Sequence, residues 1–246
     1  NTSIQIEYNY SDYDRIRRII TRPGKLEFRL VHSASETIQK INEIDNYLAS
    51  KERTPFSYYN IFYNSPEYAE YGLIWVELEH IEKVDSIFKS EDIIKKLNKG
   101  IFVWGNKVES MPDVNEGLSY KNLYYVKDKI EISGGDLKSS EAAIAPPEQR
   151  HQTGKYVIDV EMGDEGTKKW RRTTGQNVGS RVAIILDDEI YMAPVINDRI
   201  PNGRTQISGL ESFQEAEDIV TVLAAGEMDA FKVGEARLIG SSLGAD

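Results

Sequence analysis

The strongest structural signal in the sequence is the stretch VAIILDDEIYMAPV, residues 182–195. Two apolar runs, 182–186 and 190–195, flank the acidic residues 187–189. β-Branched runs separated by a short polar turn are typical of a β-hairpin. We therefore expect two paired strands in this stretch.

Patterns on both sides of the hairpin predict further strands and helices. Apolar residues at every second position indicate half-buried strands, and apolar residues at helical spacing behind a capping residue indicate helices. The predicted strands are 4–8, 25–31, 73–79, 101–104, 124–126, 156–162, a short strand that ends at 207 after a turn at 201–203, and 231–239. The predicted helices are 12–20, 36–48, 90–98, 164–177 and 212–223, and polar, proline-bearing stretches predict loops at 54–71 and 139–154. This mixture predicts an α+β fold.

Length and composition describe an ordinary globular protein. The 246 residues suit one large or two modest domains, and 40% are hydrophobic and 28% charged. The best apolar runs, 182–186 and 219–225, fall short of the ~18 residues that a membrane span needs. The polar start, residues 1–10, has no signal-peptide pattern. These features fit a cytosolic protein or a segment excised from a longer one.

The charge and the cysteine count exclude several classes of function. The formal net charge is −10, and such a field repels phosphate backbones. The strongest basic cluster is only Arg15, Arg17 and Arg18, so we expect no nucleic-acid partner. The absence of cysteine excludes disulfides, thiolate metal sites and cysteine nucleophiles.

No pattern for catalysis, a cofactor or a metal ion is found. The three histidines, His32, His80 and His151, are far apart in the sequence. The glycines of residues 163–168 lack the spacing of a phosphate loop, and the acidic residues 187–189 lack the alternation of a calcium loop. Structural or solvated roles explain these residues, so we predict no catalytic, cofactor-binding or metal site.

The middle of the chain is rich in tyrosine. Exposed tyrosines are favoured where a surface binds peptide or sugar, and tyrosines can equally pack beneath long loops. The sequence leaves both interpretations open. The five candidates for substrate contact are Tyr58, Tyr59, Tyr63, Tyr68 and Tyr71.

Several further stretches occur in the order found in one known family. They are KLEFRLV (25–31), SGGDL (133–137), NVGSRVAIILDDEIYMAPVI (177–196), GRTQISG (203–209), LAAG (223–226) and VGEARLIGSSLGAD (233–246). Together they resemble the extracytoplasmic domain of the SecD family, accessory subunits of the Sec protein-export channel. Ala236 and Ser241 depart from the family pattern. The resemblance covers about 4–31 and 123–246, and about 33–118 is a family-atypical insertion of unknown role.

The resemblance implies a two-part fold. A ferredoxin-like base would be formed by the chain ends, residues 1–31 and 210–246, with an α+β head inserted at 32–209. The crossings between the two parts would then be hinges, with Val31 and His32 as candidates at the first and Ser208 and Gly209 at the second, because glycine absorbs changes in φ and ψ. In the family a membrane helix follows the last motif, so the sequence resembles a segment that ends just before one.

The resemblance also implies a function in protein export. SecD works with SecF beside the SecYEG channel and belongs to the RND superfamily of proton-driven transporters. The implied role is to bind the emerging preprotein on the extracytoplasmic (periplasmic) side of the bacterial inner membrane and to assist completion of translocation driven by the proton-motive force. Residues that carry protons belong to membrane helices of the family, so no catalytic residue and no cofactor are implied here.

Two other function classes stay open on the sequence. One is an extracytoplasmic module whose tyrosine-rich segment binds a glycan or a partner protein. The other is a hydrolase built on scattered carboxylates, for which no nucleophile and base are paired in the sequence.

Overall fold

The computed structural model describes residues 25–61, 74–110, 118–145 and 154–225. Its strands are β1 (Leu26–Leu30), β2 (Asn60–Ile61), β3 (Ile74–Glu77), β4 (Gly100–Ser110), β5 (Ser119–Lys127), β6 (Ile132–Ser133), β7 (Leu137–Ile144), β8 (Tyr156–Met162), β9 (Val182–Leu186), β10 (Glu189–Met192) and β11 (Arg204–Ile207). Its α-helices are α2 (Ala34–Ser50), α4 (Ile81–Phe88), α5 (Glu91–Ile94), α6 (Asp164–Gln176) and α7 (Phe213–Ala225). Short 3-10 helices cover Phe56–Tyr58, Leu78–His80 and Gly134–Asp136.

The strands form two sheets. The larger sheet has the order β2-β3-β5-β4-β10-β9-β1-β6, and the smaller has the order β11-β8-β7. The hairpin expected at 182–195 is present, with β9 and β10 paired antiparallel. Asp187 and Asp188 form its turn with φ values of 51° and 66°, which aspartate tolerates better than most residues do.

Five strands of the larger sheet close into a small barrel. Strands β5, β4, β10, β9 and β1 pair in that order. Val31, just after β1, then pairs with Val126 of β5, and the N–H of His32 donates to the carbonyl of Tyr125 at 2.9 Å. Alternate side chains of the ring gather in one buried cluster: Val31, Val103, Val126, Ala183, Ile185, Ile190 and Ala193. These small and β-branched residues fill the barrel interior.

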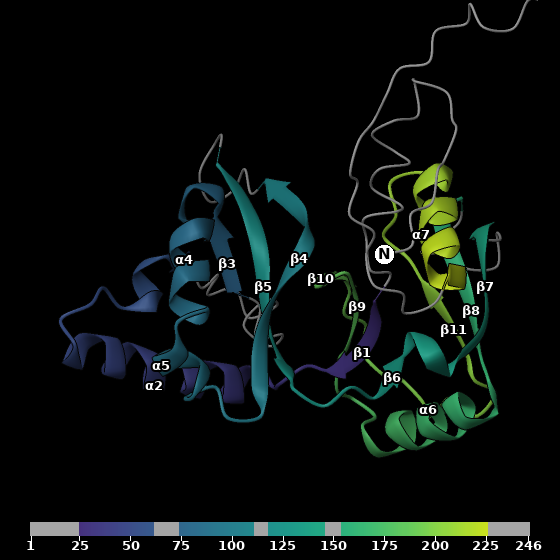
Figure 1. Ribbon diagram of the computed structural model, residues 1–246, viewed down its shortest axis with the longest axis horizontal. Coiled ribbons are helices and arrows are strands. Elements are labelled where there is room, and N and C mark those ends of the chain that lie inside the picture. Colours follow the sequence, from purple (N-terminus) through teal and green to yellow (C-terminus); the bar gives the residue numbers. More distant parts are fainter. Residues whose placement is uncertain (1–24, 62–73, 111–117, 146–153, 226–246) are drawn as a thin grey trace, which may run out of the picture.

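A helical lobe, called here the N-lobe, covers the outer face of β4 and β5. Helices α2, α4 and α5 and strands β2 and β3 build it (Figure 1). Ser33 starts α2 with a capping box, in which its hydroxyl accepts from the N–H of Glu36 and the Glu36 carboxylate accepts from the N–H of Ser33. The N-lobe core is Ile41, Ile44, Leu48, Phe56, Ile74, Val76, Val84, Ile87, Phe88, Ile93, Leu97, Leu123 and Tyr125.

A second lobe, the C-lobe, covers the outer face of β1 and β9. It consists of β6, α6, the three-stranded sheet and α7, which packs against β7 and β8 (Figure 1). Trp170 of α6 meets Phe28 of β1 edge to face, with ring centroids 5.4 Å apart. The barrel therefore has a separate hydrophobic core on each outer side.

The structure confirms most of the expected elements and corrects two. The predicted loop 139–154 is wrong over its first part, because residues 137–144 form β7 and pair antiparallel with β8. Small and polar residues suit this edge strand, and the two prolines that suggested a loop lie beyond its end. The predicted helix 90–98 is shorter, at Glu91–Ile94, and the preceding α4 was not predicted.

The α+β class is confirmed. The predicted strands 4–8 and 231–239 and helix 12–20 lie outside the described residues, so the ferredoxin-like base stays a prediction. None of the described helices has the length and apolar content needed to cross a membrane.

Candidate functional site

The barrel is open at one end, where β4 and β10 diverge. These strands pair in parallel at only two positions, Trp104 with Glu189 and Gly105 with Ile190. Beyond them the register of β4 against β5 shifts between Trp104 and Val108, and that of β10 against β9 shifts between Ile190 and Met192. Bulges bend a strand and increase its twist. Two bulges at the same level thus separate the two strands.

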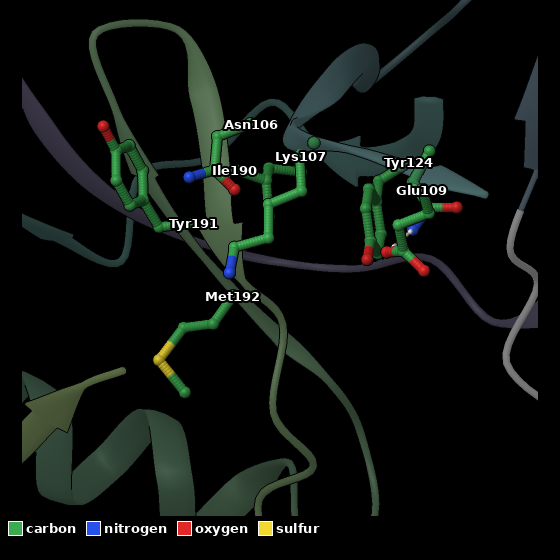
Figure 2. Close-up of a pocket in the computed structure, with 9 residues that line it drawn as sticks. Asn106, Lys107, Glu109, Tyr124, Ile190, Tyr191 and Met192 are labelled. Carbon is green, nitrogen blue, oxygen red and sulfur yellow. Dashed lines mark hydrogen bonds between the residues drawn. The ribbon is translucent and has the colours of Figure 1, made fainter. Parts of the chain in front are cut away.

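A small pocket of about 70 Å³ lies in this opening. Tyr124 and Ile190 pack with the barrel interior and also line the pocket, so the pocket is the mouth of the barrel. Figure 2 shows Tyr124 and Glu109 at one end and Tyr191 and Met192 at the other. The full lining is Gly105, Asn106, Lys107, Glu109, Asn122, Tyr124, Ile190, Tyr191 and Met192.

The pocket is lined mainly by polar residues, with Ile190, Met192 and the rings of two tyrosines as its apolar part. Burial raises the pKa of Glu109, an effect that Lys107 partly opposes. The Asn122 side-chain amide donates to Glu109 at 3.4 Å, whereas its buried carbonyl oxygen has no hydrogen-bond partner among the described residues. Burial also raises the pKa of Tyr124. Hydrogen-bonding groups beside apolar ones can bind a polar backbone next to a small apolar group.

The two candidate tyrosines that the structure describes lie on the N-lobe. Tyr58 is 74% exposed, and its ring meets that of Tyr59 edge to face, with centroids 5.3 Å apart. Tyr59 packs against His80 at 5.4 Å, and the Lys83 amino group lies 5.9 Å from the Tyr59 ring centroid. Tyr58 thus offers a free aromatic face, while Tyr59 is partly used in packing. Tyr63, Tyr68 and Tyr71 lie outside the described residues.

The first pair of hinge candidates is part of the barrel closure. Val31 is buried in the barrel core, and its N–H donates to the Arg181 carbonyl at 2.9 Å. His32 stacks on Tyr125 with ring centroids 4.2 Å apart. Movement at this crossing would have to break these contacts.

The second pair of hinge candidates lies beside the pocket. The N–H of Ser208 lies 3.2 Å from the Met192 sulfur. Gly209 has a φ of 90°, a left-handed conformation that favours glycine, and a side chain there would lie 3.4 Å from the Tyr191 carbonyl oxygen. The structure therefore places Ser208 and Gly209 against Met192 and Tyr191, two residues that line the barrel mouth.

The two described histidines, His32 and His80, lie in different parts of the fold. His32 packs in the barrel closure, His80 lies in the N-lobe, and His151 is outside the described residues. His80 does lie near Glu77 and Glu79, with the possible ligand atoms within 4.8 Å of one another. These three residues are close in the sequence and Glu79 is 73% exposed, so their proximity alone does not indicate a metal site.

Sequence reasoning missed the pocket residues. The signal was Gly105, a glycine within a β-rich run, which is typical of a bulge. The contribution of β10 could not be anticipated, because it depends on the parallel pairing of two segments about 80 residues apart in the chain.

Comparisons with known proteins bear on the whole domain. A family model described as "SecDF, P1 head subdomain" matches residues 103–230. Protein translocase subunit SecD of Rhodothermus marinus is 39% identical over 126 residues, which are 50% of this chain and 19% of that protein. Protein translocase subunit SecD of Calditerrivibrio nitroreducens is 34% identical over 168 residues, 66% of this chain and 31% of that protein.

A solved structure of SecDF, described as a membrane component that enhances protein export, has a similar fold. It covers 96% of this chain and 78% of its own, with a TM-score of 0.52 and 22% identity. This likeness concerns the fold alone. The chain spans less than a third of the length of the two curated relatives.

Proposed function

Because this chain belongs to the SecDF family of protein translocase subunits, through its match to the P1 head subdomain, we propose that it contacts preprotein during export. In this proposal the parent protein is held in the membrane, and the domain lies on the extracytoplasmic side of the bacterial inner membrane. It binds unfolded polypeptide as it emerges and hinders its return. Its role is mechanical contact rather than catalysis.

The observation that carries the proposal is the open mouth of the barrel. Its lining mixes polar groups, among them one lysine and one glutamate, with tyrosine rings and the apolar side chains of Ile190 and Met192. Unfolded preproteins share only their backbone and their mixture of side chains, so a receptor for them must tolerate sequence variation. A small, mixed opening next to exposed strand meets that requirement better than a deep, selective pocket does.

Partners and energy supply follow from family membership as part of the proposal. SecF and the SecYEG channel would be the protein partners, and the proton-motive force would drive movement of the domain through the membrane part. The barrel mouth lies next to Gly209, so a change of backbone torsion there would alter the pocket wall at Tyr191. We keep Ser208 and Gly209, with Val31 and His32, as the proposed hinges.

Binding is tested with a fluorescently labelled polypeptide that stays unfolded, such as reduced and carboxymethylated α-lactalbumin. Anisotropy is measured up to ~100 μM of the 246-residue chain, which detects affinities approaching the millimolar range. We expect saturable binding that a second unfolded polypeptide of unrelated sequence competes away. Absence of binding at this concentration would contradict the proposal for this domain.

Movement is tested by small-angle X-ray scattering of the chain and of Gly209→Pro. Proline cannot adopt the φ of 90° seen at this position, so it should change the distribution of orientations about this crossing. Identical scattering profiles from two correctly folded proteins would argue against a hinge at Gly209.

A second function is favoured by Tyr58. With 74% of its surface exposed beside Tyr59, it offers a stacking face of the kind that binds sugars or a partner protein. The domain would then be an extracytoplasmic binding module. A glycan array separates the two functions: a specific signal that Tyr58→Ala abolishes, without effect on polypeptide binding, would support the module.

A further inference from the structure

The last part of β4 is paired on one side only. Val108, Glu109 and Ser110 pair with Lys121, Tyr120 and Ser119 of β5. On the opposite side, pairing with β10 ends at Gly105, and within the described residues no strand adjoins residues 106–110 there. Residues 106–110 form the β4 edge.

An unpaired strand edge presents a row of backbone N–H and C=O groups. An extended backbone is the partner that satisfies such a row in series, because its own donors and acceptors repeat at the same interval. The edge therefore selects a conformation, an extended chain, and not a particular sequence. This is the tolerance that a receptor for unfolded polypeptide needs.

The pocket distinguishes the β4 edge from the other edges of the two sheets. Side chains of an added strand alternate between two faces, and the barrel mouth lies where the β4 edge begins. A volume of about 70 Å³ accommodates a small side chain. Val108 is an apolar residue that is 53% exposed on this edge, so it can pack against a neighbouring side chain of the added strand.

The outer edge of β7 gives the closest comparison. It is also unpaired within the described part of the chain, and it carries Ile144, 58% exposed. None of its residues lines the pocket, and Lys138 near its start is held in an ion pair with Glu161 at 2.6 Å. Both edges carry charged residues, Lys107 and Glu109 on the β4 edge and Lys138 and Glu141 on β7, so the pocket is the feature that distinguishes them.

We propose that the β4 edge, residues 106–110, takes up an extended segment of unfolded polypeptide as an added strand, with one of its side chains in the barrel mouth. This inference rests on the proposed function and assigns it a place in the structure. The occupant is a segment of preprotein, bound through its backbone.

Site-directed photo-crosslinking tests the assignment. Because the sequence contains no cysteine, a maleimide reagent labels only the cysteine that is introduced. Benzophenone-maleimide is attached to three separate variants of the 246-residue chain, Val108→Cys, Ile144→Cys and Tyr58→Cys. Residues 108 and 144 are matched, since both are apolar, lie on strands with one unpaired side and are about equally exposed. Each labelled protein is irradiated with carboxymethylated α-lactalbumin, after circular dichroism has shown that it is folded.

We expect the product at position 108 to exceed that at position 144 by about tenfold, the ratio that a preference of about 1.4 kcal/mol gives. Equal yields at positions 108 and 144, or a dominant yield at position 58, would overturn the assignment to the β4 edge. Anisotropy measured on the unmodified chain separates this outcome from failure of the proposed function. Polypeptide that binds in anisotropy but crosslinks elsewhere refutes only the β4 edge, and polypeptide that does not bind at all refutes both proposals.

Discussion

The two lobes flank the same barrel, but they differ in how their sequences are used. Of the stretches that resemble the SecDF family, the described ones lie in the barrel strands β1, β9 and β10 and in the C-lobe, and residues 226 and 233–246 lie outside the described residues. The N-lobe has its own core and none of those stretches. These stretches supply a buried ion pair on β1 and a turn that holds the start of α6 in the C-lobe. The difference teaches that the described family-like stretches specify a frame, the barrel and the C-lobe, while the N-lobe is held together by hydrophobic burial of its own residues.

The stretch KLEFRLV shows how a motif specifies the frame. Leu26, Phe28 and Leu30 face the C-lobe core. On the opposite side Arg29 bonds to Glu27 at 2.7 Å and donates to the backbone carbonyl of Asp128, although both side chains are almost buried. Burial alone would raise the pKa of Glu27, and the bonds from Arg29 and Lys25 lower it below its ordinary value. The ion pair thus fixes β1 to the link after β5.

The stretch SGGDL specifies a turn. Ser133 and Asp136 form a capping box, and the Asp136 carboxylate bonds to Lys169 of α6 at 2.6 Å. The Asp136 carbonyl accepts from the N–H of Gly163, just before α6 begins. An added side chain at Gly166 would collide with that same carbonyl, so the helix approaches the turn closely enough to require glycine.

The N-lobe is nevertheless joined to the frame. The segment expected to be an insertion, about 33–118, contains β4, which is a barrel strand, and the family match begins within it at residue 103. Removing 33–118 as a whole would therefore open the barrel. A deletion that tests the N-lobe alone has to stop before Gly100.

The largest effect is expected from the barrel core, which connects the lobes. Ile185→Ala removes a side chain that is 3% exposed and should cost about 2–5 kcal/mol of unfolding free energy. Ile41→Ala in the N-lobe is the matched control, since Ile41 is 2% exposed. Urea unfolding is followed separately through two probes of the N-lobe core, Trp75 of β3 and Trp104 of β4, and through Trp170 of the C-lobe. Variants that keep only one of these two sets of tryptophans separate the signals.

We expect Ile185→Ala to lower the unfolding midpoint at both sets of tryptophans by the same amount. A lower midpoint at only one set of tryptophans would mean that the barrel does not couple the unfolding of the two lobes.

An effect of similar size is expected from a motif glycine of the C-lobe. Gly203 has a φ of 67°, and an added side chain would overlap the Thr167 hydroxyl. Gly179 has a φ of 86° with nothing within 4 Å, so Gly179→Ala should show only the backbone cost of about 1–2 kcal/mol. Gly203→Ala adds about 1–3 kcal/mol for the overlap. Thermal denaturation compares the two variants. Equal losses of stability would mean that the turn at Gly203 moves away from Thr167 without an energetic cost.

The next effect concerns Tyr125, which lies between the barrel and the N-lobe. Its hydroxyl donates to the Leu97 carbonyl at 2.6 Å, and burial raises its pKa to about 12. Tyr125→Phe should cost about 0.5–1.5 kcal/mol at pH 8. Since the folded state holds this proton more tightly than the unfolded state, the native chain loses stability as the pH rises from about 10 to about 12.

The stability difference between the native chain and Tyr125→Phe should therefore shrink above pH 10. Urea unfolding at pH 8, 9, 10 and 11 measures it, and a difference that stays constant over this range would contradict the assignment to Tyr125.

The smallest effect is expected at the start of the N-lobe. Ser33→Ala removes the cap of α2 and should cost about 1 kcal/mol, whereas Ser35→Ala, exposed in the first turn, should change little. The backbone N–H of Ser33 lowers the pKa of Glu36, so the contribution of that carboxylate is present at neutral pH and is lost on acidification through its lowered pKa. If Ser33→Ala lost less unfolding free energy than Ser35→Ala, the Ser33 cap would not stabilise α2.

Local patterns predicted the individual elements, and long-range pairing decided the rest. The hairpin, β8, α6 and α7 follow from periodicity and turn residues within each stretch. Strand β7 was not predicted because its alternation of apolar and polar residues is weak and it is held by pairing with β8. The barrel closure between Val31 and Val126, and the mouth between β4 and β10, join segments far apart in the chain, which no local pattern can encode.

Amide hydrogen exchange of the 246-residue chain, with and without saturating carboxymethylated α-lactalbumin, tests the central claim most directly. An added strand shields the backbone N–H groups that it pairs with, so we predict slower exchange concentrated in residues 106–110 and unchanged exchange along β7. Polypeptide that is demonstrably bound while residues 106–110 exchange at their free rate would contradict the claim that the barrel mouth receives an extended chain.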